Sequence, residues 1–133
     1  MQKHIKLWLL NDRLFKFLSV LATLIVIYFS LKVPNPNAKN WYFIIVRGDL
    51  FLHFVCYFGL SSIYFYAFLN IEKGKLYAFL LSVFVGSILE ILQIVPFFKR
   101  FFDFQDLIAN FIGAIGGIIS NKLFSIQTNN KLF

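Results

Sequence analysis

The chain has 133 residues, of which 59% are hydrophobic, 20% are aromatic and only 14% are charged. This composition excludes an ordinary soluble domain, which needs a larger share of charged residues to cover its surface. In a soluble protein the formal net charge of +7 would suggest a nucleic-acid partner. Here the basic residues stand in short stretches between apolar segments, so we attribute them to membrane topology and expect no nucleic-acid binding.

The sequence predicts four membrane-spanning helices, at about residues 17–31, 50–71, 76–98 and 107–124. Each segment is near the about 20 residues that a helix needs to cross a hydrocarbon core of about 30 Å. The first segment follows a basic stretch, as in a signal peptide, but no A-x-A-like site follows it, so we interpret it as an uncleaved anchor. We therefore expect an all-α polytopic membrane protein: an antiparallel bundle of four transmembrane helices that forms a single domain over residues 1–133.

The distribution of basic residues indicates an orientation. With four spans, both termini and the central loop share one side of the membrane, and eight of the 13 Lys and Arg residues fall on that side. Because basic loops tend to remain in the cytoplasm, we expect a multi-pass protein of the cell membrane with cytoplasmic termini.

Eight polar residues stand where three of the spans reach the same membrane face. They are Asp49 and His53 at the start of the second span, Glu90 and Gln93 near the end of the third, and Arg100, Asp103, Asp106 and Asn110 around the start of the fourth. In an antiparallel bundle these positions meet whichever way the protein inserts, and helical spacing places the members of each group on one side of their helix. We expect them to form a polar binding pocket, at the outer leaflet under the charge count.

A stripe of small residues accompanies the polar one. Ala109, Gly113 and Gly117 follow the small-xxx-small spacing that allows close helix approach in lipid. Gly86 stands on the polar side of the third span. We therefore expect the third and fourth spans to meet through these faces.

Glu90 is the most costly residue of the set, because an ionisable side chain in hydrocarbon costs about 2.5–3.5 kcal/mol. It must be protonated, paired or hydrated, and its candidate partners are Arg100, His53 and Gln93. Arg100 has three open interpretations: an anion clamp, an anchor at the lipid headgroups, or a salt bridge with Asp103. Asp103 also suits an N-cap of the fourth helix.

His53 allows three interpretations: an interfacial residue, a general base or a metal ligand. A zinc site would need Glu90 and Asp106 as companions, which is an unusual donor set. We therefore assign no metal and expect no cofactor.

Three motifs together resemble bacterial VanZ-like membrane proteins. They are D-x-x-x-H-F-x-x-Y from Asp49 to Tyr57, E-x-x-Q from Glu90 to Gln93, and R-x-x-D-x-x-D-x-x-x-N-x-x-G-x-x-x-G from Arg100 to Gly117. The resemblance covers residues 49–117 and implies a four-span protein of the cell envelope, in a family linked to resistance to the glycopeptide teicoplanin. This chain has Leu50 where the family usually has a Lys, although Arg47 is nearby.

Three functions remain open. The first is a binding protein for an anionic amphiphile: a membrane phospholipid, a polyprenyl-phosphate carrier or a lipoglycopeptide. The second is an intramembrane acid–base enzyme acting on a lipid-linked substrate, with Glu90, His53 and Asp106 as catalytic candidates. The third is a proton-coupled small transporter that uses Glu90, although small multidrug transporters carry their acid in the first span. Oligomeric state and partner proteins stay open.

Overall fold

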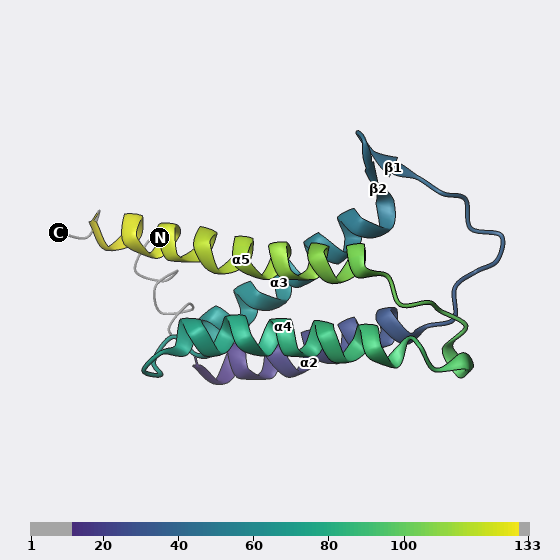
Figure 1. The fold of residues 1–133 in the computed structure, drawn as a ribbon. Coiled ribbons are helices and arrows are strands. Elements are labelled where there is room, and N and C mark those ends of the chain that lie inside the picture. Colours follow the sequence, from purple (N-terminus) through teal and green to yellow (C-terminus); the bar gives the residue numbers. More distant parts are fainter. Residues whose placement is uncertain (1–11, 131–133) are drawn as a thin grey trace.

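The computed structural model describes residues 12–130, with side chains described for residues 13–127. Within that range the chain forms four long helices, a short hairpin between the first two and a 3-10 helix before the last. Figure 1 shows the arrangement of the four long helices and the hairpin. The elements are α2 (Asp12–Leu31), β1 (Tyr42–Phe43), β2 (Val46–Arg47), α3 (Gly48–Ala67), α4 (Gly74–Leu92), η1 (Pro96–Phe98) and α5 (Phe104–Asn130). Successive helices run in opposite directions, so the α2–α3 and α4–α5 connections lie at the same end of the bundle. The prediction of an all-α antiparallel four-helix bundle is confirmed.

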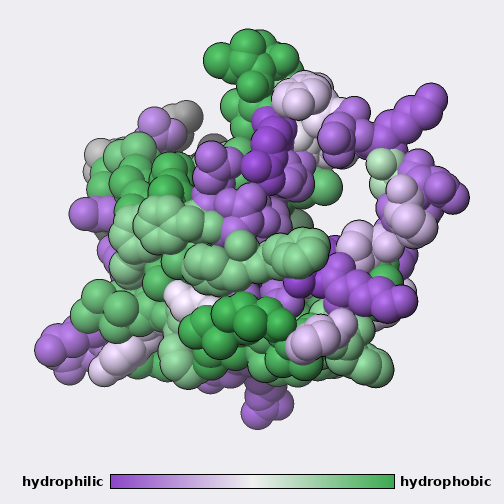
Figure 2. Space-filling model, turned by 45° about the vertical axis from the view of Figure 1, so that its right-hand side comes forward, coloured by the Kyte–Doolittle hydropathy of each residue, from purple (hydrophilic) through white to green (hydrophobic). Residues whose placement is uncertain are grey.

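All four helices are long and apolar enough to cross a membrane, over residues 13–31, 48–67, 74–92 and 104–127. Large hydrophobic side chains are exposed on every helix, including Leu24, Leu52, Phe84 and Ile112. Figure 2 shows hydrophobic side chains over most of the bundle and hydrophilic ones gathered where the hairpin and the α2–α3 connection emerge. Such an apolar outer surface is stable in lipid, and the chain is a multi-pass membrane protein.

The helix ends differ from the predicted ones for local reasons. α4 ends at Leu92 rather than near residue 98, because Pro96 has no N–H to donate and holds Val95 in an extended conformation. α5 begins three residues earlier than predicted, because the Asp103 carboxylate accepts a hydrogen bond from the Gln105 backbone N–H at 2.8 Å. This contact is an N-cap, which is one of the roles considered for Asp103.

The α3–α5 pair makes the most extensive helix contact of the bundle. Gly113 and Gly117 of α5 permit it, since a Cβ atom at either position would overlap the backbone carbonyl oxygen of Phe54 or Phe58. The glycines of α5 therefore face α3, whereas we expected them to face α4. The third and fourth spans do meet nearby, where a Cβ at Gly86 would lie 3.4 Å from the Cβ of Asn110.

The hairpin was not predicted from the sequence. Its strands pair antiparallel, with Tyr42 opposite Arg47 and Phe43 opposite Val46. The turn places Ile44 at a φ of 59°, which is unusual for a β-branched residue, and leaves Ile44 and Ile45 more than four-fifths exposed. The hairpin leads directly into α3 and so fixes where Arg47 lies.

Candidate functional site

Four polar side chains from three helices meet near the end of the bundle that carries the hairpin. His53 lies in the second turn of α3, Glu90 lies in the last turn of α4, and Asp106 and Asn110 lie in the first two turns of α5. Because α4 runs opposite to α3 and α5, its C-terminal end lies beside their N-terminal ends. We call these four residues the His53 cluster.

The His53 imidazole is at the centre of the cluster. Its Nδ1 atom lies 2.8 Å from the side-chain oxygen of Asn110 and 3.7 Å from Glu90 Oε1, and its Nε2 atom lies 3.4 Å from Asp106 Oδ2. An amide oxygen can only accept, so Nδ1 carries the proton of the neutral ring and Nε2 carries a lone pair. Since that lone pair faces a carboxylate oxygen, a proton or another positive charge is needed between the two atoms.

The cluster is buried and incompletely satisfied. The exposed fractions are 1% for Glu90, 8% for Asp106 and 2% for Asn110. Within the described part of the chain, Glu90 Oε2, Asp106 Oδ1 and Asn110 Nδ2 have no hydrogen-bond partner. An unmade hydrogen bond at a buried group costs about 1–3 kcal/mol, and more at a charged one. The cluster therefore offers two acceptors and one donor to a further group.

Arg47 lies at the rim of the cluster, at the end of β2. Its guanidinium donates to both oxygens of Asp49, to Asp103 Oδ2 at 3.1 Å and to Gln105 Oε1 at 3.0 Å. It lies 3.9 Å from Asp106 Oδ1, beyond hydrogen-bonding distance. These bonds raise the pKa of Arg47, first through Asp49 and then through Asp103. The Gln105 N–H and, to a smaller extent, Arg47 lower the pKa of Asp103.

Two of the predicted site residues point toward α2 instead. Gln93 is buried and donates to the Ser30 carbonyl at 3.1 Å. Arg100 donates to the carbonyls of Lys32 at 2.9 Å and Phe29 at 3.3 Å, where the last turn of a helix lacks internal donors. Of the three candidate partners of Glu90, the structure brings only His53 to it.

The cation nearest the cluster is therefore Arg47 rather than Arg100. The sequence signal for Arg47 was its position two residues before Asp49, close to Leu50, where the resembled family usually has a Lys. Its contact with Asp103, 56 positions away, depends on the hairpin, which the sequence did not predict.

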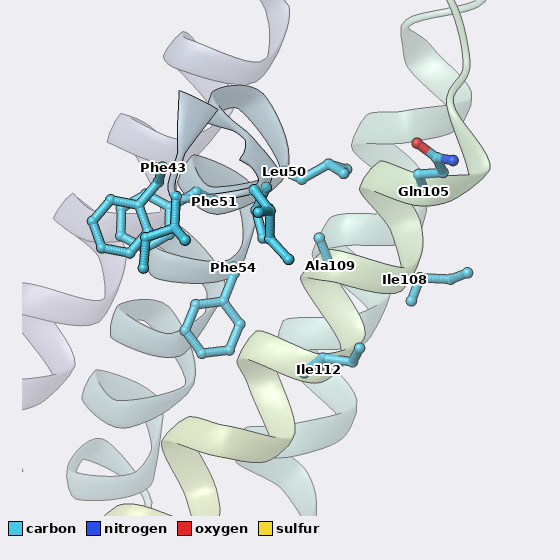
Figure 3. Close-up of a pocket in the computed structure, with 11 residues that line it drawn as sticks. Phe43, Leu50, Phe51, Phe54, Gln105, Ile108, Ala109 and Ile112 are labelled. Atoms are coloured by element: carbon cyan, nitrogen blue, oxygen red, sulfur yellow. The ribbon is translucent and has the colours of Figure 1, made fainter. Parts of the chain in front are cut away.

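An apolar groove of about 720 Å³ adjoins this site, between the hairpin, α3 and α5 (Figure 3). Phe43, Phe54, Ala109 and Ile112 are among the side chains that line it. Gln105, the polar residue of the lining, is also the acceptor for Arg47. The groove and the charged rim thus share one side chain.

The sequence was compared with protein-family models, curated proteins and solved structures. The VanZ/LLP1 family model matches residues 10–125. The chain belongs to this family. No match was found among curated proteins or among solved structures. The matched range of the VanZ/LLP1 protein includes the whole His53 cluster and Arg47.

Proposed function

We propose that this VanZ/LLP1-family protein binds the anionic headgroup of an amphiphile at the outer leaflet of the cell membrane. The observation that carries the proposal is the double role of Gln105, which lines the apolar groove and accepts a hydrogen bond from Arg47. A molecule with a charged head and a hydrocarbon tail needs this pairing of a polar site with an apolar groove. The tail would lie in the groove, and the head would lie against Arg47.

The hydrogen-bond donors near the proposed headgroup position favour an anionic headgroup. Arg47 is partly exposed, and the side chains of its partners Asp49 and Asp103 are 50% and 32% exposed. Exposed ion pairs of this kind are worth about 0–1 kcal/mol, so a phosphate or carboxylate can compete for the guanidinium. Asn110 Nδ2 is a second donor and has no partner among the described residues. We therefore propose that Arg47, rather than Arg100, contacts the anion.

The proposal includes an orientation in which the His53 cluster faces the outside of the cell. The excess of Lys and Arg on the side of the termini supports cytoplasmic termini, which puts the His53 cluster at the extracytoplasmic face. Phospholipids, polyprenyl-phosphate carriers and lipoglycopeptides are the amphiphiles available there. Binding of the last class would alter susceptibility to teicoplanin, as the resemblance to the VanZ-like family implies.

A lipid-binding measurement tests the proposal. Purified protein in phosphatidylcholine nanodiscs is titrated with phosphatidylglycerol, and retained lipid is counted by native mass spectrometry. We expect Arg47→Gln to weaken retention about 10-fold or more, as for loss of a charge-assisted hydrogen bond, and Arg100→Gln to leave it unchanged. Equal retention by wild type and Arg47→Gln would remove Arg47 as the headgroup contact.

A second pair of variants tests the groove. Ala109→Phe places a ring among the groove residues, whereas Ile119→Phe adds one at an exposed position of the same helix outside it. We expect only Ala109→Phe to lower lipid retention. A similar loss in both variants would show that the groove does not hold the tail.

The geometry also favours a second candidate, an intramembrane acid–base enzyme acting on a lipid-linked substrate. The specific observation is that His53 has a carboxylate within 4 Å of each ring nitrogen. Such a set can accept a proton at one atom and return it at another. Lipid analysis of cells with Glu90→Gln protein separates the two functions: one accumulating lipid species favours the enzyme, and an unchanged lipid profile favours binding alone.

A further inference from the structure

We propose that His53, Glu90 and Asp106 bind a divalent transition-metal cation. Each residue offers one ligand atom, and the three atoms lie within 4.8 Å of one another. Two ligand atoms that share a Zn²⁺ ion at about 2.0–2.2 Å can be at most about 4.4 Å apart. The limit of 4.8 Å exceeds this value by about 0.4 Å, so side-chain movements would have to bring the three atoms together around one ion.

The charge balance of the cluster favours a cation. Two buried carboxylates face one imidazole, and like charges repel strongly in a medium of low dielectric constant. The nearest guanidinium, that of Arg47, bonds to Asp49 and Asp103 and stays 3.9 Å from Asp106. A divalent ion would neutralise both Glu90 and Asp106 at once.

The unpaired oxygens are a separate observation that points to a ligand. Glu90 Oε2 and Asp106 Oδ1 have no hydrogen-bond donor within residues 13–127, although both residues are more than nine-tenths buried. Buried carboxylate oxygens are normally satisfied by a donor or by a metal ion. A cation between them accounts for both oxygens together.

The hydrogen bond to Asn110 prepares His53 as a ligand. Metal-binding histidines usually donate the second ring N–H to an oxygen acceptor, which fixes the tautomer and the ring orientation. Here Nδ1 faces Asn110 Oδ1 at 2.8 Å, and this leaves the Nε2 lone pair directed toward Asp106. We assign the metal contact to Nε2 and a positioning role to Asn110. Glu90 Oε1, which lies 3.7 Å from Nδ1, would move toward Nε2 to reach the same ion.

The donor set defines the class of ion. One imidazole nitrogen with two carboxylates suits Zn²⁺ or Mn²⁺, whereas Mg²⁺ and Ca²⁺ prefer oxygen ligands alone. Three protein ligands leave at least one coordination position for water or for an oxygen of another molecule. Asn110 Nδ2 is a donor without a partner in the described part of the chain and is available to such an oxygen.

Metal titration of the full chain tests the proposal without any amphiphile. The protein carries no polyhistidine tag, has His4→Gln so that His53 is its one histidine, and is stripped with a chelator in neutral detergent. Zn²⁺ is then added in competition with a chromophoric chelator. We expect one saturable site per chain, weakened about 100-fold by Glu90→Gln and by Asp106→Asn and about 10-fold by Asn110→Ala. Glu72→Gln is the control, since Glu72 is an exposed acid in the α3–α4 connection at the opposite end of the bundle, and it should bind as the parent does.

Pulsed electron paramagnetic resonance of bound Mn²⁺ keeps the test valid if a variant misfolds. With ¹⁵N-labelled histidine we expect a nitrogen coupling from His53 in the parent protein. Absence of saturable binding in the parent, equal binding by Asp106→Asn, or Mn²⁺ without nitrogen coupling would each overturn the proposal. Because no anionic lipid is present, these outcomes are independent of the lipid titration.

Discussion

His53 Nδ1 lies 2.8 Å from the side-chain oxygen of Asn110, although the two residues are 57 positions apart in the chain. The contact joins α3 to α5 at the depth of the buried carboxylates. It also selects which ring nitrogen of the neutral imidazole holds the proton, because the amide oxygen has no hydrogen to give. The position of Asn110 therefore sets the chemistry available at Nε2.

Removing the Asn110 amide should release this tautomer preference. In a His4→Gln background, ¹⁵N spectra of the neutral ring in the parent protein should show the Nδ1-protonated form. Asn110→Ala should shift the ring toward a mixture of tautomers. Asn121→Ala is the control, since Asn121 bonds to Ser62 across the same helix pair but far from the ring. An unchanged tautomer ratio in Asn110→Ala would contradict the assignment.

The glycines of the α3–α5 contact should tolerate no side chain. A methyl group at Gly113 would overlap the Phe54 carbonyl oxygen, so Gly113→Ala must separate the helices and should cost about 1–3 kcal/mol of stability. Gly59 lies in α3, and a methyl group there would meet nothing within 4 Å, so Gly59→Ala should be neutral or stabilise by up to about 1 kcal/mol. Unfolding in mixed micelles followed by tryptophan fluorescence measures both. Equal losses in the two variants would refute the close contact.

Asp103 should contribute a pH-dependent part of the stability. Its folded-state pKa is below the unfolded value of about 3.9, so the ionised carboxylate stabilises the fold above that pH and the contribution is lost as the pH falls through the folded pKa. Asp103→Asn keeps an N-cap but loses the ion pair with Arg47. We expect it to be less stable than wild type at neutral pH by up to about 1 kcal/mol, with the difference vanishing in acid. Thermal unfolding across this pH range measures the effect, and a difference that grows in acid would contradict it.

Arg100 should stabilise the end of α2 rather than bind an anion. Arg100→Ala removes the donors to Phe29 and Lys32, each bond being worth about 1 kcal/mol. Hydrogen exchange over residues 30–32 should then become roughly fivefold faster or more. Lys99→Ala, one residue earlier, is the control and should leave the exchange unchanged. Unaltered exchange in Arg100→Ala would show that the carbonyl contacts do not hold α2.

The sequence predicted the helices and the convergence of their polar ends for one physical reason. Four consecutive segments that each cross the membrane must alternate in direction, so the start of α3, the end of α4 and the start of α5 share one end of the bundle. Helical periodicity then placed His53, Glu90 and Asp106 toward one another, as the structure has them.

The direction of Arg100 was not predictable in the same way. The chain between α4 and α5 turns through η1 and through Lys99 at a φ of 50°, which sends Arg100 toward α2. The hairpin was also beyond sequence reasoning, because two-residue strands with Ile44 in the turn lack the Gly or Asn that usually marks one. Loop geometry of this kind decides which arginine reaches the site.

Because of the glycine contact, α3 and α5 hold their site residues in a more rigid arrangement than α4 does. His53, Asp106 and Asn110 belong to two helices whose backbones touch and have no room to slide, whereas Glu90 belongs to α4, which packs less extensively on both. A small tilt of α4 would carry one carboxylate toward or away from three stationary groups. The spacing of the site can thus adapt to occupants of different size through a movement of one helix.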